Sequence, residues 1–262
     1  MIKNIFALFL LFTCQIGMSQ TVNSKAINSL PLVCDSYIGF DILGNSYYIK
    51  ENALYKKSDS KLWNYKNISL GKIMSVDIIN PLQIVIFYED FNTAILLDNQ
   101  LNEIQKINFA RLENPIMASE VRLSGRNQLW FYNTTTQKIG LFNYTKNTST
   151  EFPIPIQGTL KHTSSDFNNF YWIDDLNNCY SISIYGQIKL LGKVPAFKMV
   201  QIIDDRKLLF SVDDKIYVLD YEKNSSVELK IVENSFDKFY FKDQILAIFT
   251  DQQITNFKIK LP

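Results

Sequence analysis

Histidine is the side chain that most often acts as an acid or base in enzymes. The 262 residues of this sequence include only one, His162. A metal centre built from several imidazoles is therefore excluded, and a Ser-His-Asp triad would have to use this one side chain. His162 lies in the stretch LKHTSSDF, where the alternation of residues is typical of a β-strand. We therefore expect His162 to be an ordinary strand residue, exposed to solvent or hydrogen-bonded.

Other catalytic signatures are also missing from the sequence. No G-x-S-x-G turn, P-loop, paired-cysteine motif or EF-hand loop occurs. Cys14 falls within a segment predicted to be removed, and Cys34 and Cys179 are expected to be buried thiols, with a disulfide between them as the alternative. We therefore predict no catalytic residues and expect no cofactor.

Acidic residues recur at similar places, where a run of apolar residues ends and a short turn begins. Aspartate is a favourable turn residue, because its carboxylate accepts hydrogen bonds from nearby backbone amides. Gathered on one surface, the same acids would instead attract a basic partner or a cation. Both interpretations are open from the sequence. The candidate partner-binding residues are Glu89, Asp90, Asp174, Asp175, Asp213, Asp214 and Asp251.

The segments that carry these acids repeat along the chain. A polar lead-in followed by a continuous apolar run occurs six times, at intervals of about 40 residues. An alternating strand precedes most runs, as in residues 73–79, and further strands follow, as in residues 93–98 and 103–109. The first apolar residues of the six runs are Tyr47, Ile84, Leu129, Phe170, Leu208 and Ile245.

A repeat of this length that contains four short strands is typical of a β-propeller blade. The sequence therefore predicts an all-β protein, a β-propeller with six four-stranded blades. A two-sheet sandwich and an open β-solenoid are the alternatives. Because equivalent loops of a propeller lie on the same face, the acidic turns are expected to form a ring around one end of the molecule.

The last repeat stops at QITNFKIKLP, after its third strand. The segment KAINSLPLV, residues 25–33, is predicted to supply the missing fourth strand, because a ring closed in this way leaves no strand edge unpaired. We expect this closing strand to bury its four large apolar side chains, which are Ile27, Leu30, Leu32 and Val33.

The N-terminal residues have the pattern of a secretory signal. Lys3 is followed by an apolar run over residues 5–12, and small residues stand at positions 17 and 19, where a signal peptidase cleaves. We predict a signal peptide over residues 1–19 and a single propeller domain over residues 20–262. The apolar run is shorter than the roughly 20 residues that span a bilayer, so no transmembrane anchor is expected. Lipid attachment at Cys14 is the alternative.

The style of this signal, which ends in Ser-Gln, and the abundance of Lys, Asn and Ile resemble exported proteins of AT-rich bacteria of the Bacteroidetes type. That resemblance implies a location in the periplasm or at the cell surface. The overall charge limits the partners, because 27 basic and 26 acidic residues give a net charge of +1. Neither a nucleic acid nor an anionic membrane surface is expected to bind such a chain.

One stretch resembles a known family. In DILGNSYYI, residues 41–49, the order of Asp41, Gly44, Asn45 and Tyr47 resembles the Asp-x-x-Gly-Asn-x-aromatic signature of NHL and lactonase-like six-bladed propellers. The resemblance covers one blade only, although LSGRNQLW, residues 123–130, keeps a Gly and an Asn in similar places. It implies a tight turn between the first two strands of the blade, since Gly and Asn accept positive φ at little cost.

Three classes of function are open. The prediction is a non-enzymatic propeller that acts as a monomeric scaffold and binds proteins of the cell envelope, because the scaffold is evident and the chemistry is not. The first alternative is a protein that binds a small molecule or glycan in the central depression. The second is a metal-dependent hydrolase, because lactonase-like propellers hold a divalent cation with Glu, Asn and Asp side chains in their tunnel. Fold alone does not decide among them.

Overall fold

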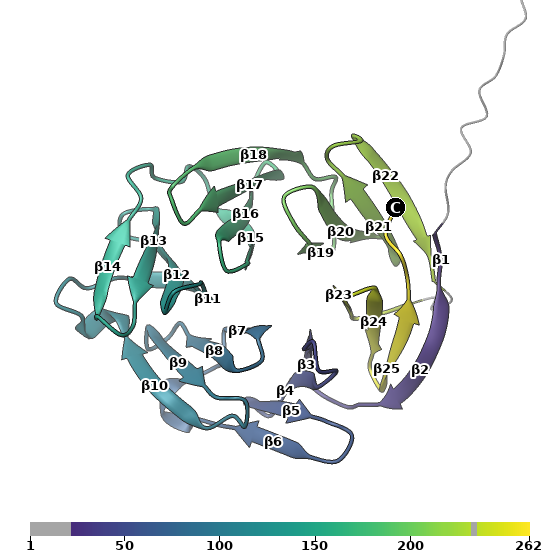
Figure 1. The fold of residues 1–262 in the computed structure, drawn as a ribbon, viewed down its shortest axis with the longest axis horizontal. Helices are drawn as coiled ribbons and strands as arrows, with labels where there is room; N and C mark the ends of the chain where they lie inside the picture. The colour runs from purple at the N-terminus through teal and green to yellow at the C-terminus, as the bar shows by residue number, and fades with distance from the viewer. Residues whose placement is uncertain (1–21, 232–234) are drawn as a thin grey trace, which may run out of the picture.

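The computed structural model describes residues 22–231 and 235–262, which form six β-sheets arranged in a ring around a central space (Figure 1). Each sheet contains a run of antiparallel strands whose innermost member borders the centre and whose outermost member lies at the rim (Figure 1). The protein is therefore a six-bladed β-propeller, and the predicted fold class and number of blades are confirmed.

The strands of each blade follow one another along the chain from the centre to the rim. Blade 1 contains β3 (Ser36–Phe40), β4 (Ser46–Lys50), β5 (Ala53–Lys57) and β6 (Leu62–Tyr65). Blade 2 contains β7 (Ser75–Asn80), β8 (Gln83–Tyr88), β9 (Thr93–Leu97) and β10 (Glu103–Asn108). Blade 3 contains β11 (Ala118–Leu123), β12 (Gln128–Asn133), β13 (Lys138–Asn143) and β14 (Thr148–Glu151).

The second half of the ring repeats this order. Blade 4 contains β15 (Leu160–Ser165), β16 (Asn169–Asp174), β17 (Asn178–Ser183) and β18 (Ile188–Lys193). Blade 5 contains β19 (Met199–Ile202), β20 (Lys207–Val212), β21 (Lys215–Asp220) and β22 (Ser225–Lys230). Blade 6 contains β23 (Lys238–Lys242), β24 (Ile245–Thr250), β25 (Gln253–Lys258) and the N-terminal strand β2 (Lys25–Pro31). Two short 3-10 helices, η1 (Ile68–Leu70) and η2 (Phe109–Arg111), lie in the connections on either side of blade 2.

The apolar runs found in the sequence are the second strands of the blades. In β8, for example, all residues from Ile84 to Tyr88 are buried. Such strands are apolar on both sides because each blade packs against a neighbour on either side. Among the described residues, the buried side chains form one hydrophobic cluster at each of the six junctions between blades. The core is therefore a ring of interfaces and not a single central mass.

The ring closes as predicted, because β2 pairs antiparallel with β25 from Lys25 opposite Lys258 to Pro31 opposite Gln253. A feature that we did not predict precedes it, since β1 (Val22–Asn23) pairs parallel with β22 and so joins the N-terminal segment to blade 5 as well. Figure 1 shows this segment running along the rim outside both blades.

The expected burial of the closing strand is wrong for three of its four apolar residues. Leu32 is buried, but Ile27, Leu30 and Val33 are 52%, 45% and 65% exposed. The physical reason is that radial blades diverge toward the rim, so the outermost strand has no neighbouring sheet to pack against. Closure therefore depends mainly on the backbone hydrogen bonds of the β2–β25 ladder.

The antiparallel order of the strands gives the disc two distinct faces. We call the end that carries the turns between second and third strands, together with the connections from blade to blade, the connection face. The opposite end, which carries the turns between first and second and between third and fourth strands, is the hairpin face. Within the described part of the chain, no helix has the length and apolar character needed to cross a membrane.

Candidate functional site

The turn over residues 41–45 joins β3 to β4 on the hairpin face, and its hydrogen bonds centre on the buried carboxylate of Asp41. This carboxylate accepts hydrogen bonds from two backbone amides of the turn, from the Asn45 side chain and, at 2.9 Å, from Tyr47 Oη. Lys56 Nζ lies 3.8 Å from Asp41 Oδ2, and both side chains are buried. The stretch is thus a tightly bonded turn, as its resemblance implied, and it leaves no carboxylate oxygen available to a ligand.

The same arrangement occurs a second time in blade 4, where the sequence analysis did not find it. Asp166 accepts hydrogen bonds from the backbone and side-chain nitrogens of Asn169 and, at 2.8 Å, from Tyr171 Oη. The sequence signal was present as Asp-x-x-Asn-x-Tyr. It is one residue shorter than the spacing from Asp41 to Tyr47 and lacks the glycine, so a search for the full signature missed it.

The candidate partner-binding acids lie on the connection face, because all of them flank turns between second and third strands. Six are exposed, and they come from blades 2, 4, 5 and 6: Glu89, Asp90, Asp175, Asp213, Asp214 and Asp251. Asp174 is different, since it is buried and accepts hydrogen bonds from the backbone amides of Leu176 and Asn178. Blades 1 and 3 contribute none of these acids, so the ring that they form is incomplete. Their role in binding stays a prediction.

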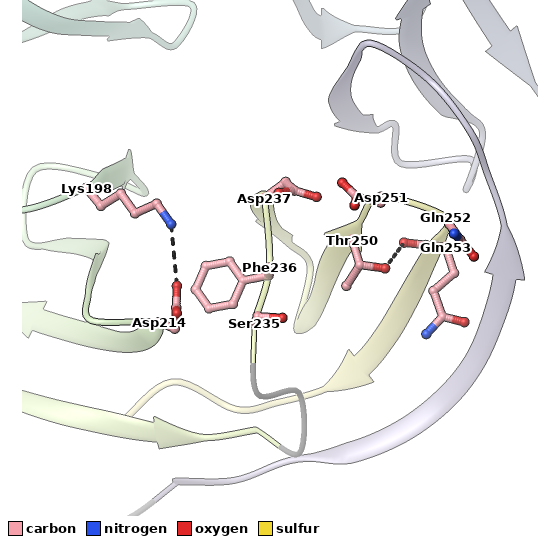
Figure 2. A pocket seen from close by; sticks show the side chains of 9 residues that line it. All are labelled: Lys198, Asp214, Ser235, Phe236, Asp237, Thr250, Asp251, Gln252 and Gln253. Carbon is pink, nitrogen blue, oxygen red and sulfur yellow. Dashed lines mark hydrogen bonds and ion pairs between the residues drawn. The ribbon is translucent and has the colours of Figure 1, made fainter.

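A cleft of about 550 Å³ opens on the connection face between blades 5 and 6. On one side, Lys198 Nζ lies 3.4 Å from Asp214 Oδ1; on the other, Asp237 and Asp251 face each other beyond the ring of Phe236 (Figure 2). Partial burial and the neighbouring charge of Asp251 raise the pKa of Asp237. The cleft therefore holds two like charges in repulsion beside one ion pair.

Exposed apolar side chains also gather on the connection face. Seven large ones stand in its turns and connections, over the two thirds of the disc formed by blades 1 to 4: Val33, Ile68, Met74, Phe91, Met117, Ile154 and Leu176. The hairpin face carries five in its turns: Ile42, Leu43, Leu82, Phe167 and Tyr185. Large apolar groups exposed on one face mark an interaction surface where they lie together, whereas single ones are common on protein surfaces. We call the first group the connection-face patch.

The innermost strands enclose a central chamber of about 1050 Å³. Basic side chains from several blades line it, namely Lys72, Arg122, His162, Lys238 and Lys242. Arg122 is held in place by Thr163 Oγ1, which lies 2.9 Å from its Nη2, and by Glu120 Oε2 at 3.4 Å. The apolar parts of the wall include Ile38 and Ile78. This chamber did not figure among the predicted site residues, because its members come from strands that are far apart in the sequence.

His162 is a strand residue in β15, as expected, but its side chain borders the chamber. Burial, together with the nearby positive charges of Arg122 and Lys238, lowers its pKa to about 3. The imidazole is therefore neutral at physiological pH. Burial and the charge of Arg122 also lower the pKa of Lys238.

Carboxylates do not converge in the way a metal site requires within the described residues. Over residues 22–231 and 235–262, no three or more His, Cys, Asp or Glu side chains are placed to hold a metal ion. Cys34 and Cys179 are both free thiols, and they belong to different junctions, those between blades 6 and 1 and between blades 4 and 5.

Comparisons with known proteins agree on the fold and on little else. No family model and no curated protein matches the sequence. Virginiamycin B lyase from Staphylococcus aureus superposes with a TM-score of 0.56 at 15% identity, over 88% of this chain and 80% of that one. A protein of unknown function from Bacteroides thetaiotaomicron gives 0.60 at 12% identity, over 91% and 76%.

BBS1N, solved in complex with ARL6DN, gives a TM-score of 0.58 at 10% identity, over 89% of this chain and 81% of that one. Identities this low show a shared fold and carry no catalytic or binding residue across. A lyase and a protein solved with a partner thus share their architecture with this chain, which is a six-bladed β-propeller closed by its own N-terminal strand.

Proposed function

We propose that this protein is an exported propeller of the bacterial cell envelope that binds a partner protein on its connection face and catalyses no reaction. The observation that carries the proposal is the connection-face patch, where seven large apolar side chains stand exposed over four neighbouring blades. Large apolar groups that are exposed to water promote aggregation, and in many proteins a binding partner covers them.

The composition of the connection face suits an interface with a protein. Phe91, Met74 and Met117 expose large apolar side chains on it, and Phe and Met are enriched in the buried cores of protein interfaces. Exposed acids stand beside the patch, with Glu89 and Asp90 next to Phe91 and Asp175 next to Leu176. Acids at the rim of an interface speed association with a basic partner and select against acidic ones. We therefore expect the partner to present an apolar surface with basic residues around it.

The acids keep a role in this proposal, but only those that solvent reaches. Asp174 contributes to the turn and not to the surface, because its carboxylate is already occupied by backbone amides. The Asp214 carboxylate is partly neutralised by Lys198. Glu89, Asp90 and Asp175 are thus the acids from which we expect the largest effect on partner binding.

Site-specific photocrosslinking in the native envelope tests this proposal. A photoreactive phenylalanine analogue replaces Phe91 or Leu176 on the connection face, and Leu82 or Tyr185 on the hairpin face as matched exposed controls. We expect one and the same protein to be crosslinked from both connection-face positions and from neither control. A partner crosslinked only from the hairpin face, or from no position, would show that the patch is not the binding surface.

A second arm separates charge from apolar contact. Replacing Glu89, Asp90 and Asp175 by their amides should weaken capture of the crosslinked partner at low salt, and much less at high salt, because mobile ions screen exposed charges. Replacing Phe91 and Leu176 by serine should abolish capture at either salt concentration. Equal capture by the native protein and by both variants would contradict the proposal.

A further inference from the structure

The chamber in the middle of the ring holds lysines that lack acidic partners, whereas Arg122 is paired with Glu120 at 3.4 Å. Lys238 and Lys242 stand four residues apart on β23, with Tyr240 between them, and Lys72 stands in the connection that leads into blade 2. Among the described residues, the ion pairs of the protein involve other bases, and none includes these three lysines. Lys72 is exposed, whereas Lys238 and Lys242 are partly buried. An unpaired charge that is partly removed from water is unfavourable unless something compensates it.

Three acids line the same chamber, but each is engaged by hydrogen bonds from the protein. Asp35 accepts from the backbone amide of Glu51 at 2.7 Å. Asp77 accepts from the backbone amide of Leu123 at 2.9 Å and from that of Ile79, and it thereby ties blade 2 to blade 3. The third, Asp166, is the centre of the blade 4 turn described above. These carboxylates offset part of the positive charge, and none of them is within ion-pair distance of a lysine.

The basic groups act on one another across the ring. Arg122 belongs to blade 3, His162 to blade 4 and Lys238 to blade 6, which lies opposite blade 3 (Figure 1). The charges of Arg122 and Lys238 both lower the pKa of His162, and Arg122 lowers that of Lys238, so the three groups lie near enough for their charges to act on one another. Perturbed groups that converge in a cavity mark functional sites more often than chance would give.

We propose that the central chamber is a binding site for a small organic anion, a carboxylate or a phosphate compound, held between Arg122 and Lys238 with the neutral imidazole of His162 as a hydrogen-bonding partner. The chamber, at about 1050 Å³, reaches the upper end of the range of pockets that enclose small molecules. A guanidinium presents a planar fork that matches carboxylate and phosphate oxygens, and Thr163 already fixes its orientation here.

The apolar parts of the wall, such as Ile38 and Ile78, favour an organic ligand over an inorganic ion. The chamber and the connection-face patch share one residue, Met74, but the proposed anion contacts are made by Arg122, His162 and Lys238 on innermost strands, and Phe91 and Leu176 do not line the chamber. Either proposal therefore survives the failure of the other.

The single histidine makes the test direct, because a protein labelled with carbon-13 in histidine gives one imidazole signal. The full mature chain, purified with a tag that contains no histidine, is titrated with citrate as the carboxylate probe and with pyrophosphate as the phosphate probe. Sodium chloride at matched ionic strength and sucrose serve as controls. We expect a saturable shift of the His162 signal with at least one anion and none with either control. The two anions then distinguish the carboxylate source from the phosphate source.

Anion binding should also change the pKa of His162. An anion beside His162 offsets the charges of Arg122 and Lys238, so the imidazole pKa should rise from its value in the free protein when the site is filled. A structural role for the cluster would produce no such ligand-dependent change in pKa.

Substitutions locate the site. Lys238→Met should weaken anion binding by about tenfold or more, whereas Lys238→Arg, which keeps the charge, should retain most of it. Lys189→Met makes the same change in net charge at an exposed position on the outer strand β18 and should leave binding unchanged. Because Lys238 has no acidic partner, Lys238→Met should fold and melt at the native temperature or above it.

Two results would overturn the proposal. One is a His162 signal that responds to neither anion, or only in proportion to ionic strength. The other is equal affinity of Lys238→Met and the native protein for the anion. If Lys238→Met were to fail to fold, the lysine would have a structural partner, and the argument from unpaired charge would be wrong; Lys242→Gln then tests the chamber without relying on Lys238.

Discussion

Acidic residues have different roles on the two faces of this propeller. On the hairpin face, the acids of the first turns are consumed by the fold: Asp41 and Asp166 each accept several hydrogen bonds from their own turn, including one from a tyrosine hydroxyl. On the connection face, Glu89, Asp90 and Asp175 are exposed. An aspartate in a turn can therefore stabilise the turn or face the solvent, and the burial of its carboxylate decides between these two roles.

On the connection face, two asparagine side chains link neighbouring blades by hydrogen bonds. Asn52 and Asn92 are the last turn residues before the third strands of blades 1 and 2, and both have positive φ. The side chain of Asn52 bonds to Gly71 and Ile73 in the connection to blade 2. Asn92 does the same to Ile116 and Ala118 ahead of blade 3. Each of these side chains thus latches its blade to the next one, while the acids beside it are free to face solvent.

The largest effect that separates the faces is expected from Asp41→Ala on the hairpin face. The substitution leaves Tyr47 Oη without its acceptor and the buried ammonium of Lys56 without its counter-charge. We expect a loss of about 3–5 kcal/mol in the free energy of unfolding, measured by urea denaturation, because breaking a buried pair strands a charge. Asp90→Ala on the connection face should stay within about 0.5 kcal/mol of the native protein. Similar losses for both would mean that the faces do not differ.

A smaller loss is expected from Asn92→Gly, which removes the latch but keeps a residue that accepts positive φ without strain. The buried backbone groups of Ile116 and Ala118 then lose their partner, at a cost of about 1–3 kcal/mol in the free energy of unfolding. Asn147→Gly, at an exposed positive-φ turn position on the hairpin face, is the matched control and should change stability very little. Equal effects at the two positions would assign the loss to the turn and not to the latch.

Asp251→Asn should raise stability slightly at neutral pH, because it removes the like charge that faces Asp237. The pKa of Asp237 is raised in the folded state, so repulsion weakens the fold as pH rises through that pKa and disappears below the ordinary value of 3.8, where the carboxyl is protonated. The melting temperature should therefore rise by no more than about 2 °C at pH 7, and the difference from the native protein should vanish as pH falls below 3.8. A gain that persists in acid would point to another cause.

The smallest effect on stability is expected from the triple replacement of Glu89, Asp90 and Asp175 by their amides. All three side chains are exposed, and Asn is as good a turn residue as Asp, so the melting temperature should stay within about 2 °C of the native value. Adding Asp174→Asn to this variant should lower it clearly, because that buried carboxylate accepts hydrogen bonds from two backbone amides of its turn. Thermal denaturation followed by circular dichroism measures both.

The sequence predicted the architecture well because the physics of a blade is local. A buried second strand must be apolar on both sides, so the six runs that begin at residues such as Ile84 and Leu129 stand out at regular intervals. The closing strand was predictable from the missing fourth strand of the last repeat. Its exposure was not, because the divergence of the blades at the rim is a property of the whole ring.

The chamber was beyond the reach of the sequence for a related reason. Arg122, His162 and Lys238 come from three blades, and no local pattern marks them as neighbours. The alternation in KFYFK does place Lys238, Tyr240 and Lys242 on one side of a strand, but it does not say that this strand is innermost. Burial likewise separates Asp174 from Asp175, although the two look equivalent in the sequence.

The pairing of β2 with β25 also determines when the ring can close during folding. Ser29 and Thr255 are hydrogen-bonded partners 226 residues apart, so this contact spans nearly the whole chain. Long-range pairing of this kind slows folding, because the chain loses the entropy of a large loop before the strand pairing contributes any stability. As the protein is synthesised from its N-terminus, β2 emerges first and has to wait for the last repeat before it finds its place. Until then the ring stays open at one seam, and the unpaired strand β2 is where a chaperone or a second chain would bind it.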